Sequence, residues 1–198
     1  MEHVLDEILQ YEVLGLGSGS TTARILRMLK ERSGKPLKGI PSSTQIENVA
    51  LKLGFKILPF TYLNSVEAVV DGADRVVLGK YIIKGGGGAL FRERLLWEAA
   101  KKIFVFLPKG RLVDELRIPL PLEVHPFALR LVEERVKKLG ALPKLRTDKK
   151  GYPWVTENGF FILDVELNDI EKAKEIKKIP GVLETGLFIY DKVKLCPL

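Results

Sequence analysis

Short apolar runs alternate with amphipathic stretches along the first half of the chain. The runs are rich in Val, Leu, Ile and Phe, which predicts buried strands at 11–16, 57–60, 66–70 and 103–107, and a further short strand near 39–41. Between them, apolar residues recur every three or four positions, which predicts helices at 1–10, 46–53 and 89–102 and another after residue 19. Strands that alternate with helices indicate an α/β fold, and we expect a Rossmann-like domain with an open sheet.

The pattern changes near residue 120 to strand, helix, strand, strand, helix. The expected strands are 122–124, 142–145 and 160–167, and the expected helices are 127–139 and 170–177. This split βαβ order predicts a second, smaller ferredoxin-like α+β domain. The expected division is a Rossmann-like domain at 1–119, joined by a tail at 181–198 that returns to the main sheet, and a small domain at 120–180.

Length and cysteine content fit a protein with two cores and no metal. The 198 residues, 46% of them hydrophobic, suffice for one sizeable domain and a smaller one. Cys196 is the only cysteine, which excludes an internal disulfide and a cysteine cluster for zinc. The two histidines, His3 and His125, are far apart in the sequence and belong to no ligand motif. We therefore expect no bound metal ion.

The formal net charge of +7 raises the question of nucleic-acid binding, but the basic residues are spread along the chain in short groups. Such groups at expected turns and helix ends are ordinary solvated charge, so we expect no nucleic-acid partner. No apolar run approaches the length of a membrane span, and the N-terminal segment has no signal-like apolar core. These features predict a cytoplasmic protein without a membrane partner.

Carboxylates, a lysine and glycines are concentrated between residues 69 and 102. Asp71 and Asp74 follow a buried strand, at the end where open α/β sheets bind their ligands. After a second apolar pair, Lys84 precedes a run of four glycines whose N–H groups can approach an anion closely. The predicted pocket is positive and rich in donors, and its members are Lys84 and the N–H groups of Gly85, Gly86 and Gly87.

Glu93 falls in the middle of the apolar sector of the helix expected at 89–102. A carboxylate there has a partner, lines a cavity or has a raised pKa. For a lone glutamate, a structural ion pair with Lys84 or a nearby arginine is the favoured interpretation. Beside Asp71, Asp74 and the glycines, we favour a base that removes a proton next to a carbonyl, while Lys84 and N–H donors hold the enediolate oxygen. This chemistry needs neither a metal nor a redox cofactor.

The segment GLGSGSTT at 15–22 is an expected turn from a strand into a helix. Such a glycine loop binds phosphate through backbone N–H groups and the helix dipole. It matches neither a dinucleotide fingerprint nor a P-loop, because Ser20 takes the place of the third glycine and no GK[ST] follows. Viewed alone, a glycine turn with a serine cap explains it equally well.

Two further loops carry polar residues after expected strands. Ser42 and Ser43 precede the helix expected at 46–53, and capping of that helix is favoured from the sequence alone. Lys109 and Arg111 follow the strand at 103–107, where a surface turn with two solvated cations is the ordinary interpretation.

Several segments together resemble the ribose-5-phosphate isomerase A family. DGAD, IKGGGGAL and the RER that follows resemble its active-site segment, and GLGSGSTT, IPSSTQ, PLPLEVHPF, TENGFFILDV and IPGVLETGLF resemble its other blocks in the same order. The resemblance implies an aldose-ketose isomerase of the pentose phosphate pathway that interconverts ribose 5-phosphate and ribulose 5-phosphate without a cofactor. It also implies a sugar phosphate as the small-molecule partner and assembly as a homodimer or homotetramer.

The resemblance assigns roles to individual residues. Glu93 is the base, Lys84 and the glycine N–H groups stabilise the oxyanion, and Asp71, with Asp74, assists ring opening. The implied substrate ligands are Ser18, Gly19, Ser20 and Thr21 at the phosphate, with Ser42 and Ser43 as second-rank candidates.

Three positions depart from the pattern of the family. Arg75 stands where the family has a glutamate after DGAD, and Pro108 and Arg111 stand where it has an aspartate and a lysine. Arg111 still binds phosphate in this interpretation, with a different geometry.

Two other functions share these glycine loops. One is a sugar-phosphate sensor that binds its ligand without turnover, and the other is a related enzyme, either an amino-sugar phosphate isomerase or a coenzyme A transferase. All four expected catalytic positions are present, which favours an enzyme. A transferase needs a nucleophilic glutamate, whereas an isomerase needs only a base.

Overall fold

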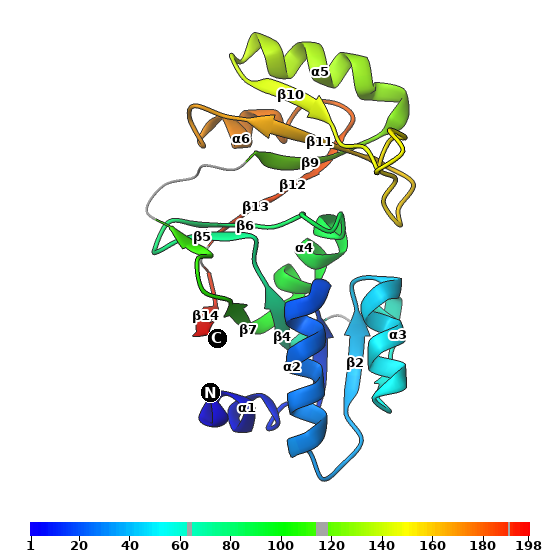
Figure 1. The fold of residues 1–198 in the computed structure, drawn as a ribbon, viewed down its shortest axis with the longest axis vertical. Helices are drawn as coiled ribbons and strands as arrows, with labels where there is room; N and C mark the ends of the chain where they lie inside the picture. Colours follow the sequence, from blue (N-terminus) through cyan, green and yellow to red (C-terminus); the bar gives the residue numbers. More distant parts are fainter. Residues whose placement is uncertain (63–64, 114–118, 190) are drawn as a thin grey trace.

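The computed structural model describes residues 1–62, 65–113, 119–189 and 191–198. They form two stacked lobes, a larger one built mainly from the first half of the chain and a smaller one that begins near residue 120 (Figure 1). Both termini lie on the larger lobe, because the last strand returns to it (Figure 1). Within the described residues, no helix is long and apolar enough to cross a membrane.

The larger lobe is built on a six-stranded parallel sheet of order β14-β7-β4-β1-β2-β3. The strands are β1 Val13–Leu16, β2 Lys38–Pro41, β3 Lys56–Ile57, β4 Val66–Gly72, β7 Ala100–Leu107 and β14 Val193–Pro197. The helices are α1 Glu2–Ile8, α2 Gly19–Arg32, α3 Thr44–Lys52 and α4 Leu90–Ala99. A central parallel sheet with helices between its strands confirms the expected Rossmann-like domain.

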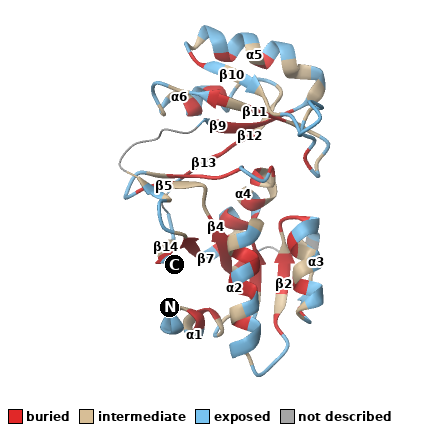
Figure 2. Ribbon diagram, in the orientation of Figure 1, coloured by how far each residue is buried: buried red, intermediate tan, exposed pale blue. Residues whose placement is uncertain are grey.

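The central strands of this sheet are buried on both faces. Phe104 and Phe106 of β7 belong to a core cluster with α1, α2 and α3, whereas Ile103 and Val105 belong to a cluster with α4. Because successive strand residues point to opposite faces, a doubly covered strand reads as a continuous apolar run. Figure 2 shows the buried residues gathered along such strands, including β4.

A second sheet, which the sequence did not predict, lies between the two lobes (Figure 1). Its order is β13-β6-β5-β8, with β5 Arg75–Val77, β6 Tyr81–Ile83, β8 Leu112–Val113 and β13 Leu187–Ile189. Strands of two or three residues are too short to show an alternating pattern. This sheet carries the chain from the DGAD turn to the glycine run.

The smaller lobe is an antiparallel sheet of order β10-β11-β9-β12 covered by α5 and α6. The strands are β9 Leu120–Val124, β10 Leu142–Leu145, β11 Phe161–Glu166 and β12 Val182–Thr185, and the helices are α5 Leu129–Lys138 and α6 Lys172–Ile176. Val132 and Val136 of α5 and Ile176 of α6 share one buried cluster with the strands. The expected small α+β domain is confirmed.

The tail after residue 181 differs from the expectation that it returns as a whole to the main sheet. β12 pairs with β9 of the small domain and β13 pairs with β6, so only β14 joins the main sheet, beside β7. The partner of a strand depends on tertiary contacts, and the apolar pattern of the tail carries no information about them. We therefore propose a revised domain division. Within the described residues, 1–113 and 187–198 form the larger domain, and 119–185 form the smaller one.

Two elements end three residues earlier than expected. α4 ends at Ala99 rather than at 102, because β4 pairs with β7 from Val66 opposite Ala100 onward and the ladder requires an extended chain there. The strand expected at 57–60 is the shorter β3, and Phe60 begins a 3₁₀ turn, Phe60–Tyr62.

Candidate active site

A cavity of about 130 Å³ lies at the carboxyl ends of β1 and β4, between the N-terminus of α2 and the glycine run. It is lined by most of the residues that the sequence predicted: Ser18, Gly19, Ser20, Thr21, Asp74, Lys84, Gly85, Gly86, Gly87, Glu93 and Arg111. Gly72 and Ala73, which sequence reasoning did not select, complete the lining. The fold therefore brings the expected phosphate loop (residues 15–22), the glycine run (residues 85–88) and Glu93, the expected base, to one place.

The phosphate loop owes its course to Gly17. A Cβ atom at this position would lie 1.9 Å from an oxygen of Asp71, so only glycine lets the loop pass over that carboxylate. Ser18 then precedes α2 with an extended backbone, and its N–H donates to Glu93 Oε1 at 3.1 Å. The N–H of Gly19 donates to Gln45 at 3.1 Å, so the N–H groups of the first helical turn after it are the ones left for an anion.

Lys84 lies between two buried carboxylates at the base of the cavity. Its ammonium group is 2.8 Å from Asp71 and 3.3 Å from Glu93, and it donates to the carbonyl of Gly72 at 2.7 Å. All three charged side chains are at most 5% exposed. The ion pair that was the ordinary interpretation of Glu93 is therefore present, but it forms part of a cluster that lines a cavity.

Burial and the neighbouring charges together set the pKa values of this cluster. Loss of solvation raises the pKa of Glu93 to about 7; Lys84 acts against the rise, and the negative charge of Asp71 adds to it. Burial alone lowers the pKa of Lys84, but Asp71 and Glu93 outweigh it, so that pKa lies above its ordinary value. Glu93 can therefore gain and lose a proton near neutral pH beside a permanent cation.

Asp71 lies beneath the cavity wall rather than in it. Its side chain is fully buried and accepts hydrogen bonds from the indole N–H of Trp97 at 2.9 Å and from the N–H of Gly72 at 2.8 Å. With Lys84 as a third partner, both oxygens are engaged within the protein. This position does not support the expectation that Asp71 exchanges protons directly with a sugar, and it makes Asp71 a support for Lys84.

The glycine run is anchored to Asp74. The N–H of Gly86 donates to the carboxylate of Asp74 at 2.7 Å, so this N–H is not directed at a ligand. The run closes as a turn in which the N–H of Gly88 donates to the carbonyl of Gly85 at 3.1 Å. Gly87 lies between these two fixed points and lines the cavity.

Two arginines hydrogen-bond to the backbone of the DGAD turn, residues 71–74. Arg75 and Arg111 both donate to the carbonyl of Asp74, at 2.7 and 2.9 Å. Arg111 also lines the cavity, as expected for a substrate ligand, whereas Arg75 is absent from the lining. The two departures at these positions thus share a structural contact.

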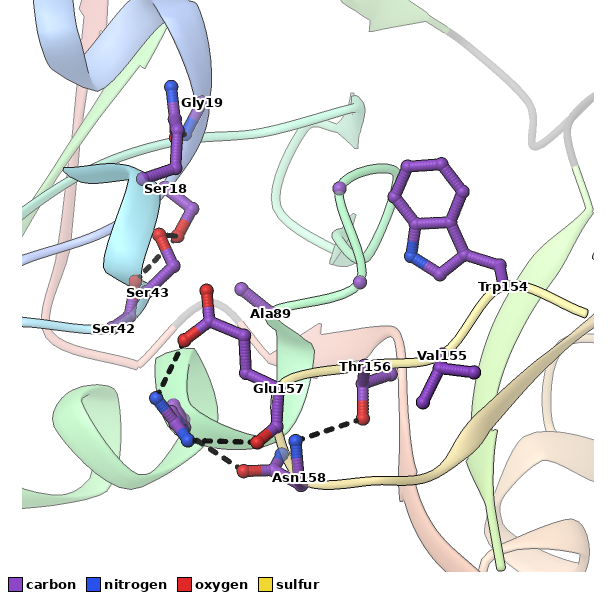
Figure 3. A pocket seen from close by; sticks show the side chains of 14 residues that line it. Ser18, Gly19, Ser42, Ser43, Ala89, Trp154, Val155, Thr156, Glu157 and Asn158 are labelled. Atoms are coloured by element: carbon purple, nitrogen blue, oxygen red, sulfur yellow. Dashed lines mark hydrogen bonds and ion pairs between the residues drawn. The ribbon is translucent and has the colours of Figure 1, made fainter. Parts of the chain in front are cut away.

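Ser42 and Ser43 lie beside the cavity rather than in its wall. The hydroxyl of Ser18 is 2.8 Å from that of Ser42 and donates to that of Ser43 at 2.7 Å. Ser43 caps α3 by accepting from the N–H of Ile46 at 3.3 Å, as the ordinary interpretation predicted. Both serines line an adjoining cavity of about 440 Å³ (Figure 3), which shares Ser18, Gly19 and Gly87 with the first.

The small domain forms the far wall of this second cavity. Glu157 reaches across and accepts from the N–H of Thr44, at 2.8 Å to the nearer oxygen, and from Arg92 of α4 at 2.9 Å. Trp154 stands on the same segment and faces the glycine run (Figure 3). The segment 154–158 therefore joins the two domains next to the site.

Sequence reasoning missed several residues that support the site. Trp97 had a local signal, because it lies four positions after Glu93 on the same helix and so falls on the same face. Gln45, Thr44 and Arg92 had none, since their partners are remote in the sequence. Among the described residues, no group of three or more His, Cys, Asp and Glu side chains is arranged to hold a metal ion.

Known proteins match this chain over most of its length. Residues 38–196 match the family described as ribose 5-phosphate isomerase A (phosphoriboisomerase A). Ribose-5-phosphate isomerase A 1 from Oceanobacillus iheyensis is 40% identical over 184 residues, which are 89% of this chain and 82% of that protein.

Two solved structures share the fold. Ribose 5-phosphate isomerase A from Methanocaldococcus jannaschii superimposes with a TM-score of 0.87 at 34% identity, covering 97% of this chain and 92% of the other. A D-ribose-5-phosphate isomerase in complex with phospho-erythronic acid gives 0.86 at 32% identity, covering 98% and 92%. The chain therefore belongs to the ribose 5-phosphate isomerase A family.

Proposed function

We propose that this chain interconverts D-ribose 5-phosphate and D-ribulose 5-phosphate, a step of the non-oxidative pentose phosphate pathway. The observation that carries the proposal is Glu93, a buried carboxylate whose pKa is raised to about 7, beside the ammonium of Lys84 in a cavity that a helix N-terminus also lines. A base poised near neutral pH and a fixed cation are what isomerisation through an enediolate requires.

The phosphate group binds at the N-terminus of α2. Ser20 and Thr21 present backbone N–H groups of the first helical turn, where the helix dipole favours an anion. Arg111 adds a positive charge to the same cavity. This placement leaves C1 and C2 of the sugar beside Glu93 and Lys84.

The reaction moves two protons and no electrons leave the substrate. Asp74, which lines the cavity, assists opening of the furanose ring, and Asp71 supports Lys84 from below. Glu93 removes the proton from C2 of the open-chain aldose, and the electron pair shifts to give a cis-enediolate held by Lys84 and the N–H of Gly87. Glu93 then returns the proton to C1, while the hydroxyl proton moves from O2 to O1, which leaves a ketone at C2. The balance closes without an electron carrier.

The neighbouring activities fit this geometry less well. A transferase must place a thioester on its glutamate, but Glu93 is 5% exposed, bound by Ser18 and Lys84, and faces a cavity of only about 130 Å³. A sensor has no use for a carboxylate whose pKa is raised beside a buried cation, because desolvating that charge costs stability without improving binding.

The deciding experiment is conversion of ribose 5-phosphate to ribulose 5-phosphate in the presence of EDTA by wild type, Glu93→Gln and Glu98→Gln. Glu98 is the matched control, because it is an exposed glutamate on the same helix. We expect Glu93→Gln to lose about 10²–10⁴-fold in kcat and Glu98→Gln to match wild type. Binding of the sugar phosphate by wild type without turnover would establish a sensor and end the isomerase proposal.

The assembly and location belong to the same proposal. A homodimer or homotetramer in the cytoplasm, with no nucleic-acid or membrane partner, is the arrangement we propose. Phe127 at 96% exposed and Leu142 at 66% exposed give the small domain apolar surface that a second copy can cover. The molar mass from light scattering tests the assembly, and a monomer at assay concentrations would refute it.

A further inference from the structure

Arg146 of the small domain reaches the glycine run of the catalytic cavity. It follows β10, and its Nη1 atom donates to the carbonyl oxygens of Gly85 at 2.8 Å and of Gly86 at 3.0 Å. On its other side, Nε donates to Asp164 of β11 at 2.8 Å, and Nη2 pairs with the second oxygen of that carboxylate. The guanidinium is therefore held in one orientation by its own domain and presented to the other.

Peptide geometry converts this contact into an orientation of N–H groups. Because the peptide unit is planar and trans, a carbonyl and the N–H that follows it point in opposite directions. Fixing the carbonyls of Gly85 and Gly86 toward Arg146 therefore turns the N–H groups of Gly86 and Gly87 away from it. The Gly86 N–H confirms this direction, because it donates to Asp74 at 2.7 Å. The Gly87 N–H therefore points away from Arg146, and Gly87 itself lines the cavity.

A run of glycines needs such an external constraint. Gly85 and Gly88 have φ angles of 106° and 81°, and glycine visits many other backbone conformations at little cost. Rotation of the peptide between Gly86 and Gly87 would replace an N–H donor by a carbonyl oxygen, which repels a developing oxyanion. Nothing within the run prevents this, since it has no side chains.

A second contact comes from the same part of the small domain. The backbone N–H of Trp154 donates to the carbonyl of Arg146 at 2.9 Å, which ties the two residues together. The indole of Trp154 packs so closely on Gly88 that a Cβ atom there would lie 2.9 Å from Nε1. Arg146 therefore contacts the first two glycines of the run and Trp154 contacts the last. Figure 3 shows the indole of Trp154 beside the loop that leads to Ala89.

We propose that Arg146 is a positioning residue for the isomerisation, which aims the N–H of Gly87 at the enediolate oxygen from the small domain. The proposal rests on the proposed function, because it assumes that the glycine run binds the oxyanion. It assigns the small domain a part in the chemistry in addition to its part in packing.

The test compares Arg146→Gln and Arg146→Lys with Arg130→Gln as the matched control. Arg130 is an exposed arginine of the small domain whose ion-pair partner, Glu133, lies on the same helix. We expect kcat to fall by about 10- to 100-fold in Arg146→Gln, somewhat less than the loss of a whole oxyanion donor. KM for ribose 5-phosphate should stay within about twofold of wild type, because the phosphate loop is untouched. The kcat of Arg146→Lys should lie between those of wild type and Arg146→Gln, since one ammonium group cannot bridge two carbonyls and a carboxylate together.

Ligand binding supplies a readout that a purely structural role would not move. Phospho-erythronic acid carries a phosphate and a carboxylate that resembles the enediolate oxygens, whereas inorganic phosphate probes the phosphate loop alone. We expect calorimetry to show weaker binding of phospho-erythronic acid to Arg146→Gln, by about the same factor as kcat, with phosphate affinity unchanged. Millimolar guanidinium should restore part of the kcat of Arg146→Ala.

The outcomes distinguish a failure of the positioning role of Arg146 from a failure of the isomerase function. If Glu93→Gln loses activity while Arg146→Gln keeps wild-type kcat, the positioning role is wrong and the isomerase mechanism stands. If phosphate affinity falls in parallel with kcat, Arg146 merely maintains the fold, which also overturns the inference. Should Arg146→Gln fail to fold, Asp164→Asn keeps the guanidinium but frees it, and an unchanged kcat in that variant would refute the proposal. Full activity of Glu93→Gln would instead remove the proposed function itself.

Discussion

The ammonium group of Lys84 lies 2.8 Å from Asp71, on the side of the cluster that a ligand cannot reach. Its second carboxylate partner, Glu93, is 3.3 Å away and lines the cavity. Lys84 thus pairs with two buried carboxylates. The closer one, Asp71, also accepts hydrogen bonds from Trp97 and Gly72. We therefore expect Glu93 to be the member of the cluster that exchanges a proton with a ligand.

The pH dependence of the reaction should follow Glu93. Because burial raises its pKa to about 7, the carboxylate form that can remove a proton is lost below that pH. We expect kcat/KM for ribose 5-phosphate to fall about tenfold per pH unit on the acid side. Initial rates between about pH 5 and 9 measure this, with Glu98→Gln as the control. A profile that is flat through pH 7 would contradict the assignment.

Asp71→Asn should move that acid limb to lower pH. The charge of Asp71 contributes to the raised pKa of Glu93, so its removal leaves Lys84 to act on Glu93 alone. We expect a lower kcat, because Lys84 loses its closest ion-pair partner. The midpoint of the acid limb of the kcat/KM profile should move to lower pH. Loss of activity with an unmoved midpoint would instead indicate that Asp71 transfers protons itself.

The fold class and most of the cavity lining were predictable because their signals are local. Doubly buried strands gave continuous apolar runs, and the phosphate loop and glycine run are contiguous motifs at strand ends. Glu93 was recognisable as a carboxylate on an apolar helix face, and the structure places it 3.3 Å from Lys84.

The remainder depends on contacts between segments far apart in the sequence. Asp71 reads as one of two equivalent aspartates in DGAD, and only packing under Gly17 and against Trp97 separates it from Asp74. The contact of Arg146 with the glycine run joins different domains, and no pattern near residue 146 records it. The pairing of β12 with the small sheet is likewise a choice of partner rather than of local conformation.

Glu93→Gln should stabilise the protein at alkaline pH. A carboxyl with a folded-state pKa of about 7 and an ordinary value of 4.5 favours folding when protonated, so its contribution is complete below 4.5 and is lost as pH rises through 7. Gln mimics the protonated form and can still accept from the N–H of Ser18. Thermal denaturation should therefore show a higher Tm than wild type near pH 8.5 and little difference near pH 5. A variant less stable than wild type at both pH values would contradict the cost assigned to the buried charge.

Gly17→Ala should lower both the stability and the kcat of the protein, because the added methyl group clashes with Asp71 beneath the loop. The added methyl group would lie 1.9 Å from an oxygen of Asp71, and this carboxylate cannot withdraw because Trp97, Gly72 and Lys84 hold it in the core. Either the phosphate loop lifts or Asp71 moves and takes Lys84 with it. We expect a loss of stability of about 1–3 kcal/mol, typical of an overpacked site, together with a fall in kcat in the protein that remains folded.

Gly34→Ala is the control for this change, because a Cβ atom at Gly34 meets nothing within 4 Å. Urea denaturation gives the free energy of unfolding, and kcat per folded molecule is measured well below the transition. If Gly17→Ala matched Gly34→Ala in both quantities, the loop would have room to move, and the close passage of the phosphate loop over Asp71 would not be what holds Lys84 in place. A loss of stability with normal kcat would show that the clash is relieved away from the cluster. Only the joint loss is consistent with one rigid unit formed by the loop, Asp71 and Lys84.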